Sequence, residues 1–345
     1  MVTSRDIAQR AGVSQATVSR VLQGNSRVAP DTRERVLAAM RATDYRPHAA
    51  ARAMKTRRSQ TIGVVIADIT NPFYPELLEA VSHALDQSGQ RMILWNSAGP
   101  GEYSALQAIR EGSVDGLLFT TVTEGAAPLT EALVHEEPVV LLHRGLEEAQ
   151  CDQVVSDNVA GGSIVADYLV RAGHEHIGYL QGPELPSTAV HRERGFRRRL
   201  HQLGMDLRPE LVGRAGFQHD TARTLIRSML HEPVPPTAVF CANDLAAFGA
   251  IDGARSLGVH VPEDLWVVGY DDIAMAAWDS FNLTSVRQPI ADLAHTAVQL
   301  LLERITDPDL PVRHELFTNS LTVRGSTAHT PLDPPAEQRD SHADD

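Results

Sequence analysis

Gln15 and Arg20, near the start of the chain, are side chains of types that recognise the edges of nucleic-acid bases. An arginine can donate two parallel hydrogen bonds to O6 and N7 of guanine, and a glutamine can pair with N6 and N7 of adenine. Ala16 offers only a methyl group, which suits a thymine methyl group or no contact at all. Hydroxyl and amide side chains nearby suit phosphate contacts, which position a protein without reading sequence. They are Thr3, Ser14, Ser19 and Asn25.

The residues that position these side chains have the pattern of two short helices joined by a tight turn. Gly12 supplies the turn, since glycine adopts positive φ at little cost, and Ser14 is placed to cap the next helix. The residues expected to face inward are Ala8, Val13, Val18, Val21 and Leu22. Those expected at or near the exposed face of the second helix are Gln15, Ala16, Ser19 and Arg20. The segment predicts a helix-turn-helix whose recognition helix begins near residue 15, a shape that fits the major groove of DNA.

Basic residues concentrate in this first part of the chain. Residues 1–60 contain twelve Lys or Arg and four Asp or Glu, a net charge of +8. The whole chain carries −13, so the remainder carries −21. A basic segment on an acidic chain favours local contact with a polyanion. A solvated basic surface without a partner is the alternative interpretation.

A third helix and a hinge are expected after the turn. Pro30 suits the first turn of a helix, and Ala29 before it lacks a capping side chain, at a cost of about 1 kcal/mol. The apolar face of this helix consists of Val36, Leu37, Ala39 and Met40. Residues 48–55 favour a helix but are too few to be stable alone, because isolated helices shorter than about 12 residues are marginal. With the polar linker 56–60, they predict a hinge that folds only when it is held.

Composition excludes several classes of protein. With 345 residues, 43% of them hydrophobic, the chain can form two or three domains with a substantial core. It has neither an apolar run long enough to span a membrane nor a signal-peptide core, so we expect a cytoplasmic protein. Cys151 and Cys241 are expected to be packed thiols. Walker, nucleophile-elbow and His-Glu-x-x-His motifs and His/Cys clusters are absent from the sequence, so we expect no enzyme, cofactor or metal.

From residue 60 onwards, strand-like and helix-like segments alternate. Strands are expected at 61–69, 91–96, 116–122, 139–143, 153–156, 176–180, 238–241 and 266–270. Helices are expected at 74–88, 105–111, 128–135, 160–172, 190–203, 221–230, 245–257 and 290–305. This alternation predicts βαβ units with parallel sheets. Two sets of such units form two lobes around a cleft, and ligands of open α/β sheets bind at the carboxyl ends of the strands.

Ordered motifs along residues 2–326 resemble those of the lactose-repressor (LacI/GalR) family of bacterial transcription regulators. In the head the motifs are Asp6-Ile7-Ala8, Ala11-Gly12-Val13-Ser14, Thr17–Leu22, Thr32–Val36, Tyr45-Arg46-Pro47 and Ala51–Met54. In the body they are Asn71–Tyr74, Gly195-Phe196, Asn243-Asp244, Val268–Asp272 and Val286–Pro289. The resemblance implies an all-α helix-turn-helix head and a two-lobed α/β body of the type I periplasmic-binding-protein kind, with parallel sheets.

The same resemblance implies a repressor that binds a palindromic operator as a homodimer and responds to a small polar effector such as a sugar. The C-terminal residues lack heptad leucines, so a dimer is expected and a tetramer is not. A transport-type solute-binding protein without a DNA role is the alternative. Its body would look the same, but a signal peptide would replace the basic head.

Four further DNA contacts follow from the resemblance: Thr17, Ala51, Met54 and Lys55. Similar proteins place a leucine at the position of Met54, where it wedges into the minor groove at the operator centre. Methionine is apolar and serves as such a wedge in other proteins. The alternative is that Met54 only fills the hinge.

By resemblance, the effector site is lined by Phe73, Tyr74, His143, Arg192, Phe217, Asn243 and Asp271. Arg192 is expected at the start of a helix and Asp271 at the end of a strand. The alternative for the aromatic residues is that they only pack in the core. Sugar-binding relatives often place an aspartate at the position of His143. A histidine cannot replace a carboxylate that accepts two sugar hydroxyls, so either the effector is not a common hexose or His143 is only a strand-end residue.

The expected domains are a helix-turn-helix head at 1–46, a hinge and linker at 47–59, and an effector-binding and dimerisation body at 60–327. Within the body, residues 60–158 with 288–317 form one lobe, and residues 159–287 with 318–327 form the other. Residues 328–345 are rich in proline and acidic residues and are expected to be a disordered tail.

Overall fold

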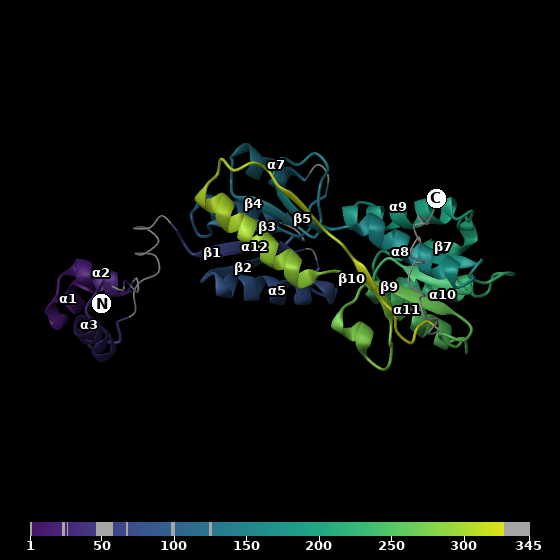
Figure 1. Cartoon of the computed structure of the whole chain (residues 1–345), viewed down its shortest axis with the longest axis horizontal. Coiled ribbons are helices and arrows are strands. Elements are labelled where there is room, and N and C mark those ends of the chain that lie inside the picture. The colour runs from purple at the N-terminus through teal and green to yellow at the C-terminus, as the bar shows by residue number, and fades with distance from the viewer. Residues whose placement is uncertain are drawn as a thin grey trace, which may run out of the picture. The chain divides into compact units, whose positions relative to one another are not determined.

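The computed structural model describes residues 2–22, 25, 27–45, 58–66, 68–97, 101–123 and 126–327. The chain divides into two compact units, residues 1–60 and residues 61–345 (Figure 1). The hinge prediction for 48–55 and the tail prediction for 328–345 lie outside the described residues.

The first unit contains the three predicted helices. They are α1 (Ser4–Ala11), α2 (Gln15–Leu22) and α3 (Pro30–Ala42). Gly12 has a φ of 63° at the turn, and the hydroxyl of Ser14 accepts a hydrogen bond of 3.1 Å from the N–H of Thr17, as the capping prediction requires. Ala29 provides no side-chain cap for α3, which the sequence also predicted.

A small core holds these three helices together. Its buried members are Ile7, Ala8, Ala11, Val18, Val21, Val36 and Ala39. Leu22 was expected inside, but it remains 36% exposed. It is the last residue of α2, and in so small a unit Val18 and Val21 already occupy the space against α1 and α3.

The second unit contains two parallel sheets, each with six strands. The first has the order β11-β5-β4-β3-β1-β2 and the second the order β12-β10-β9-β8-β6-β7. All pairings are parallel except that β12 runs antiparallel to β10. The first sheet consists of β1 (Thr61–Ile66), β2 (Arg91–Asn96), β3 (Gly116–Phe119), β4 (Val139–Leu142), β5 (Asp152–Ser156) and β11 (His314–Phe317). The second consists of β6 (Ile177–Gln181), β7 (Val212–Arg214), β8 (Ala238–Cys241), β9 (Trp266–Asp271), β10 (Thr284–Arg287) and β12 (Ser320–Thr322).

Helices connect the strands of both sheets. They are α5 (Phe73–Gln87), α6 (Gly101–Arg110), α7 (Ala127–Val134), α8 (Asn158–Arg171), α9 (Ser187–Gln202), α10 (His219–Met229), α11 (Asp244–Arg255) and α12 (Ile290–Thr306). Two short 3₁₀ helices, η1 (Pro209–Leu211) and η2 (Ala274–Ala277), complete the set. The eight predicted strands and eight predicted body helices are all present, with ends shifted by a few residues. No helix among the described residues is long and apolar enough to cross a membrane.

Four strands were not predicted from the sequence: β7, β10, β11 and β12. They are three or four residues long and contain polar residues, as in Thr284–Arg287 and His314–Phe317. They lack the continuous apolar run that marks a central parallel strand such as β1, which is buried along its whole length. Their pairing with neighbouring strands defines them.

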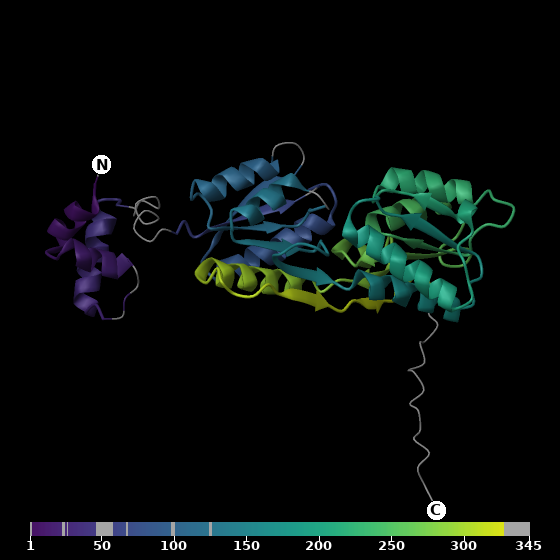
Figure 2. The ribbon, with the colours of Figure 1, turned by 90° about the horizontal axis from the view of Figure 1, so that it is seen from above.

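The chain crosses between the two lobes three times, after β5, after β10 and after β11. Figure 1 shows α12 among the elements of the first lobe, although it follows most of the second lobe in sequence. Figure 2 shows the segment after α12 running from the first lobe to the second. The buried carboxylate of Asp152 fixes this return, because it pairs with Arg304 of α12 at 3.0 Å and with Arg313 at 3.3 Å.

Helices α8 and α9 of the second lobe pack closely against each other, and this contact fixes the position of α9. A Cβ atom on Gly162 would lie 2.2 Å from the carbonyl oxygen of Arg192, and one on Gly195 would lie 2.0 Å from that of Val159. Only glycine fits at these two contacts, because the obstructing atoms belong to the backbone.

Candidate functional site

The structure places the predicted DNA-facing residues of the first unit on its surface. Gln15, Ala16 and Arg20 are exposed on α2, and Ser19 is half-buried. The amide of Gln15 donates a hydrogen bond of 2.7 Å to the hydroxyl of Ser4, which orients the side chain on the helix surface. An exposed amide and an exposed guanidinium on one short helix are thus available to base edges.

The side chains predicted to contact phosphates differ in whether they already have hydrogen-bond partners within the protein. Thr3 uses both its N–H and its hydroxyl to donate to Asp6, each at 2.8 Å, so a phosphate contact would have to displace that carboxylate. Ser14 and Thr17 share a hydrogen bond of 2.9 Å between their hydroxyls. The side-chain oxygen of Asn25 accepts from the N–H of Arg27, which leaves its amide group to donate. Ala51, Met54 and Lys55 lie outside the described residues.

A polar hollow in this unit brings Arg27 and Arg35 close to Arg20, which the sequence had already indicated as a DNA-facing residue. Its lining includes Arg20, Arg27 and Arg35, beside the polar residues Ser14, Thr17, Asn25 and Thr32. Three guanidinium groups around one concave surface suit a polyanionic backbone, because phosphate contacts supply much of the affinity for DNA. Only the tertiary arrangement of α2 and α3 reveals this grouping.

In the second unit, all seven residues predicted to line an effector site surround one cavity between the lobes. The lining consists of these seven, namely Phe73, Tyr74, His143, Arg192, Phe217, Asn243 and Asp271, together with Asn71, Arg144 and Thr188. The cavity volume is about 20 Å³, which holds about one water molecule. A sugar-sized ligand therefore needs more room than the cavity has in this conformation. Asn71, Arg144 and Thr188 were not predicted, although Arg144 adjoins His143 in the sequence.

Arg192 is held rigidly in the wall of the cavity. It lies in the second turn of α9 rather than opening the helix, because α9 begins earlier than expected, at Ser187. Its guanidinium donates to Asn158 at 2.8 Å and to the carbonyl of Ala242 at 2.7 Å, and it lies 3.7 Å from the ring centre of Tyr270. It also pairs with Asp271 at 3.1 Å.

Asp271 ends β9, as predicted, and is buried beside Arg192. Burial raises the pKa of its carboxyl group to about 6, although the charge of Arg192 and a hydrogen bond from Gln288 act in the opposite direction. A carboxyl group with such a pKa changes its charge near physiological pH, which is typical of functional sites.

His143 contacts the aromatic residues of the cavity. Its ring centre lies 4.3 Å from that of Phe73 and 6.2 Å from that of Tyr74. Burial, followed by the charges of Arg192 and Arg144, lowers its pKa well below the usual value. The imidazole is therefore neutral at pH 7, and it cannot supply the negative charge of a carboxylate.

Three cavity residues have backbone conformations that side chains rarely adopt. The φ angles are 74° at His143, 65° at Phe217 and 115° at Asp271. Non-glycine residues in this region store strain, which persists mainly where function requires a particular side-chain placement. The clustering of these residues makes the cavity a candidate functional site.

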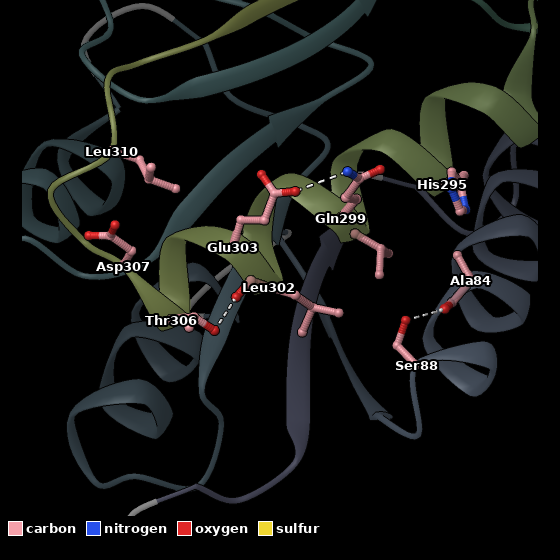
Figure 3. A pocket seen from close by; sticks show the side chains of 10 residues that line it. Ala84, Ser88, His295, Gln299, Leu302, Glu303, Thr306, Asp307 and Leu310 are labelled. Carbon is pink, nitrogen blue, oxygen red and sulfur yellow. Dashed lines mark hydrogen bonds between the residues drawn. The ribbon is translucent and has the colours of Figure 1, made fainter.

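A second groove lies on the first lobe between α5 and α12 (Figure 3). Several of its polar side chains form hydrogen bonds to groups four residues away in the sequence: Gln299 donates to Glu303 at 2.9 Å, and Ser88 donates to the carbonyl of Ala84 at 3.1 Å. They do not converge on a common point, unlike the groups around the cavity between the lobes. Among the residues that the structure describes, no group of three or more His, Cys, Asp or Glu is placed to hold a metal ion.

Comparisons with known proteins agree with this architecture. Residues 3–48 match the family model described as bacterial regulatory proteins, lacI family, and residues 166–327 match a periplasmic binding protein-like domain. The HTH-type transcriptional repressor PurR of Aliivibrio fischeri is 34% identical over 315 residues, covering 90% of this chain and 93% of the relative. The chain belongs to the LacI family.

Other LacI-family proteins extend over the same length. The ribose operon repressor of Haemophilus influenzae is 32% identical and covers 94% of this chain and 98% of the relative. The Lac repressor dimer bound to operator and the anti-inducer ONPF matches with a TM-score of 0.84 at 27% identity, over 95% of this chain and 99% of that one. The transcriptional regulator CelR in complex with cellobiose matches with a TM-score of 0.72 at 30% identity, over 94% and 100%. The chain is thus a LacI-family regulator with a helix-turn-helix domain and a two-lobed binding-protein-like body.

Proposed function

We propose that this LacI-family protein is a transcriptional repressor that binds a palindromic operator as a homodimer and is controlled by a small polar effector. The observation that carries the proposal is the presence of two different candidate sites in one chain. One is a basic unit that exposes Gln15 and Arg20 on a short helix, and the other is a cavity lined by converging polar and aromatic residues. The relatives are named as repressors, which favours regulation over catalysis.

The proposal assigns the effector to the cavity between the lobes. Converging polar groups and aromatic side chains suit a small polyhydroxylated ligand. A regulator of this family from Enterococcus faecium, 30% identical and with a TM-score of 0.70, has bound ribose. The transport-type alternative gains no support, because a solute carrier has no use for a helix-turn-helix unit.

Exposed apolar residues of the body support a second copy as the partner. β2 is an edge strand whose Ile93 and Leu94 are 41% and 38% exposed, and Trp278 after η2 is 54% exposed. An unpaired edge strand with apolar side chains tends to associate. A homodimer would cover these residues and would bring two recognition helices to a two-fold symmetric site.

Selection of bound sequences from random duplex DNA by the full-length protein tests the proposal. We expect two-fold symmetric sites and, by sedimentation, two protein chains per DNA duplex. The affinity should fall with rising salt, with a slope in the double-logarithmic plot of about −0.9 per phosphate contacted. Recovery of asymmetric sites bound by a single chain would contradict the dimeric arrangement.

The effector assignment has its own test. Thermal-shift screening of sugars, sugar acids, polyols and nucleosides should identify a ligand that stabilises the protein by about 2.7 kcal/mol at 100 times its Kd. That ligand should change operator affinity, and linkage requires operator DNA to change its affinity by the same factor. A ligand whose binding is unaffected by Asn243→Ala and Phe217→Ala would place the effector outside the cavity.

A further inference from the structure

The charges around the cavity between the lobes do not balance. Its lining contains two arginines, Arg144 and Arg192, and one carboxylate, Asp271. Arg192 and Asp271 pair with each other at 3.1 Å. Arg144 is only 8% exposed and forms no salt bridge with any carboxylate in the described part of the chain.

Arg144 is held in place by neutral groups alone. Its guanidinium donates to the hydroxyl of Tyr74 at 2.9 Å and to the carbonyl of Thr121 at 3.3 Å. Its Nε is buried and has no hydrogen-bond acceptor among the described residues. A buried charge without a counter-charge is costly, and buried charges in proteins are generally paired with a group of opposite charge.

The nearby carboxylates Glu76 and Asp272 have other partners, and the nearby imidazole is neutral. The neighbouring His143 is neutral, as its lowered pKa shows. Glu76 accepts a hydrogen bond of 2.7 Å from the N–H of Ala274 in the other lobe. Asp272 pairs with Arg287 and Arg324, each at 2.6 Å.

Other groups of the cavity also offer donors. The side-chain oxygen of Asn243 caps α11 by accepting from the N–H of Ala246 at 3.0 Å, which fixes the orientation of the amide. Its Nδ2 is buried and donates to no described residue. The hydroxyl of Tyr74 accepts from Arg144 and keeps its own proton to donate. The buried Nε of Arg144 and Nδ2 of Asn243 are thus two donors of the cavity without an acceptor among the described residues.

We propose that the effector carries an anionic group, a carboxylate or a phosphate, which binds the guanidinium of Arg144. The inference rests on the proposed function of this cavity as the effector site. An arginine presents a planar fork of donors that matches carboxylate and phosphate oxygens. Arg144 is immobilised by Tyr74 and Thr121, so it loses little side-chain freedom when an anion binds. Asn243 and the hydroxyl of Tyr74 then bind the remaining oxygen atoms of the ligand.

Calorimetric titration of the full-length protein with matched pairs of compounds tests the inference. The pairs are D-glucuronate with D-glucose, D-galacturonate with D-galactose, and D-ribose 5-phosphate with D-ribose. We expect at least one acidic member to bind about tenfold or more tightly than its neutral parent, because hydrogen bonds to charged groups contribute this much. The uronates and the sugar phosphate distinguish a carboxylate from a phosphate.

Two variants remove the surplus charge in different ways. Arg144→Gln deletes it, and His143→Asp places a carboxylate beside it at a backbone conformation that Asp tolerates. In both, the preference for the acidic member should fall to about one. Arg110→Gln is the control, since Arg110 pairs with Glu131 on α7 outside the cavity. Thermal unfolding shows whether each variant is folded.

The outcomes separate this inference from the proposed function. A neutral sugar that binds more tightly than its acid, and loses affinity in Asn243→Ala, overturns the anionic class and leaves the effector site standing. An acid whose affinity is unchanged in both Arg144→Gln and His143→Asp also overturns the anionic class. The absence of binding by every acid of the panel does so as well. An acid that binds as expected but leaves operator affinity unchanged supports the inference and contradicts the regulatory proposal.

Discussion

The side chain of Gln288 joins Asp271 to the crossings between the lobes. Its amide donates a hydrogen bond of 2.8 Å to Oδ1 of Asp271, and its oxygen accepts one of 2.7 Å from the hydroxyl of Ser156. Gln288 lies between β10 and α12, and Ser156 ends β5, so this buried side chain connects the wall of the cavity to two of the three crossings. Movement of the lobes must therefore carry Asp271 along or break one of these bonds.

Replacement of Gln288 should weaken both stability and the response to effector. Gln288→Leu leaves the hydroxyl of Ser156 and the carboxylate of Asp271 without this partner, which should cost about 1–3 kcal/mol in the free energy of unfolding. The change in operator affinity on effector addition should also shrink. Urea denaturation and operator titrations with and without effector measure the two effects.

Gln299→Leu is the matched control for that substitution. Gln299 is exposed on α12, and among the described residues its side chain bonds only to Glu303, so its replacement should change neither quantity appreciably. Equal effects of the two substitutions would contradict the special role of Gln288.

Arg20→Ala should reduce operator affinity by about 1–3 kcal/mol and relax discrimination at one base pair of each half-site. The reason is that an exposed guanidinium on the recognition helix can form a bidentate contact with guanine. Arg58→Ala, outside the helices, should instead weaken binding to all sequences alike and flatten the salt dependence. Fluorescence anisotropy with specific and random duplexes distinguishes the two; a uniform loss in Arg20→Ala would show that Arg20 binds phosphate only.

The carboxyl group of Asp271 should make stability depend on pH. Its folded-state pKa of about 6 exceeds the usual 3.8, so folding favours the protonated form. The stabilising contribution is fully present below about pH 3.8 and is lost as the pH rises through about 6. The slope in this window is at most about 1.4 kcal/mol per pH unit.

Asp271→Asn removes this contribution together with the part of the pKa rise of the buried Asp244 that the charge of Asp271 causes. His143 acts in the opposite direction, because its lowered pKa makes the fold less stable on acidification below its usual value of 6.5. Both proteins contain His143, so it largely cancels in the difference between them. The unfolding free energy of the wild type minus that of the variant should fall between about pH 4 and 6; a difference that is constant or rises with pH would refute the assignment.

Gly195→Ala should destabilise the second lobe by about 1–3 kcal/mol, because the new Cβ must push α8 and α9 apart. The displacement should also move Arg192, one turn earlier on α9, and so weaken effector binding. Arg198→Ala, at an exposed position of the same helix, should have little effect. Urea denaturation of the two variants measures the difference, and equal stability would mean that the helices can separate freely.

Most helices and strands of this protein could be predicted from local sequence patterns. The turn at Gly12, the cap at Ser14 and the central strands such as β1 and β8 depend on residues within a few positions of one another. Family motifs then indicated the seven residues that the structure brings to one cavity. Short polar strands such as β11 were missed, since a neighbouring strand rather than their own composition makes them strands.

What the sequence determined by itself is the order of helices and strands, because backbone preference and apolar periodicity are local properties. Only the tertiary structure decided the electrostatics of the cavity. Arg144 and Tyr74 are 70 residues apart in the chain and form a hydrogen bond, while Arg192 on α9 pairs with Asp271 at the end of β9. Whether a buried charge is balanced depends on which distant groups the fold brings within a few ångströms of it, and no local pattern contains that information.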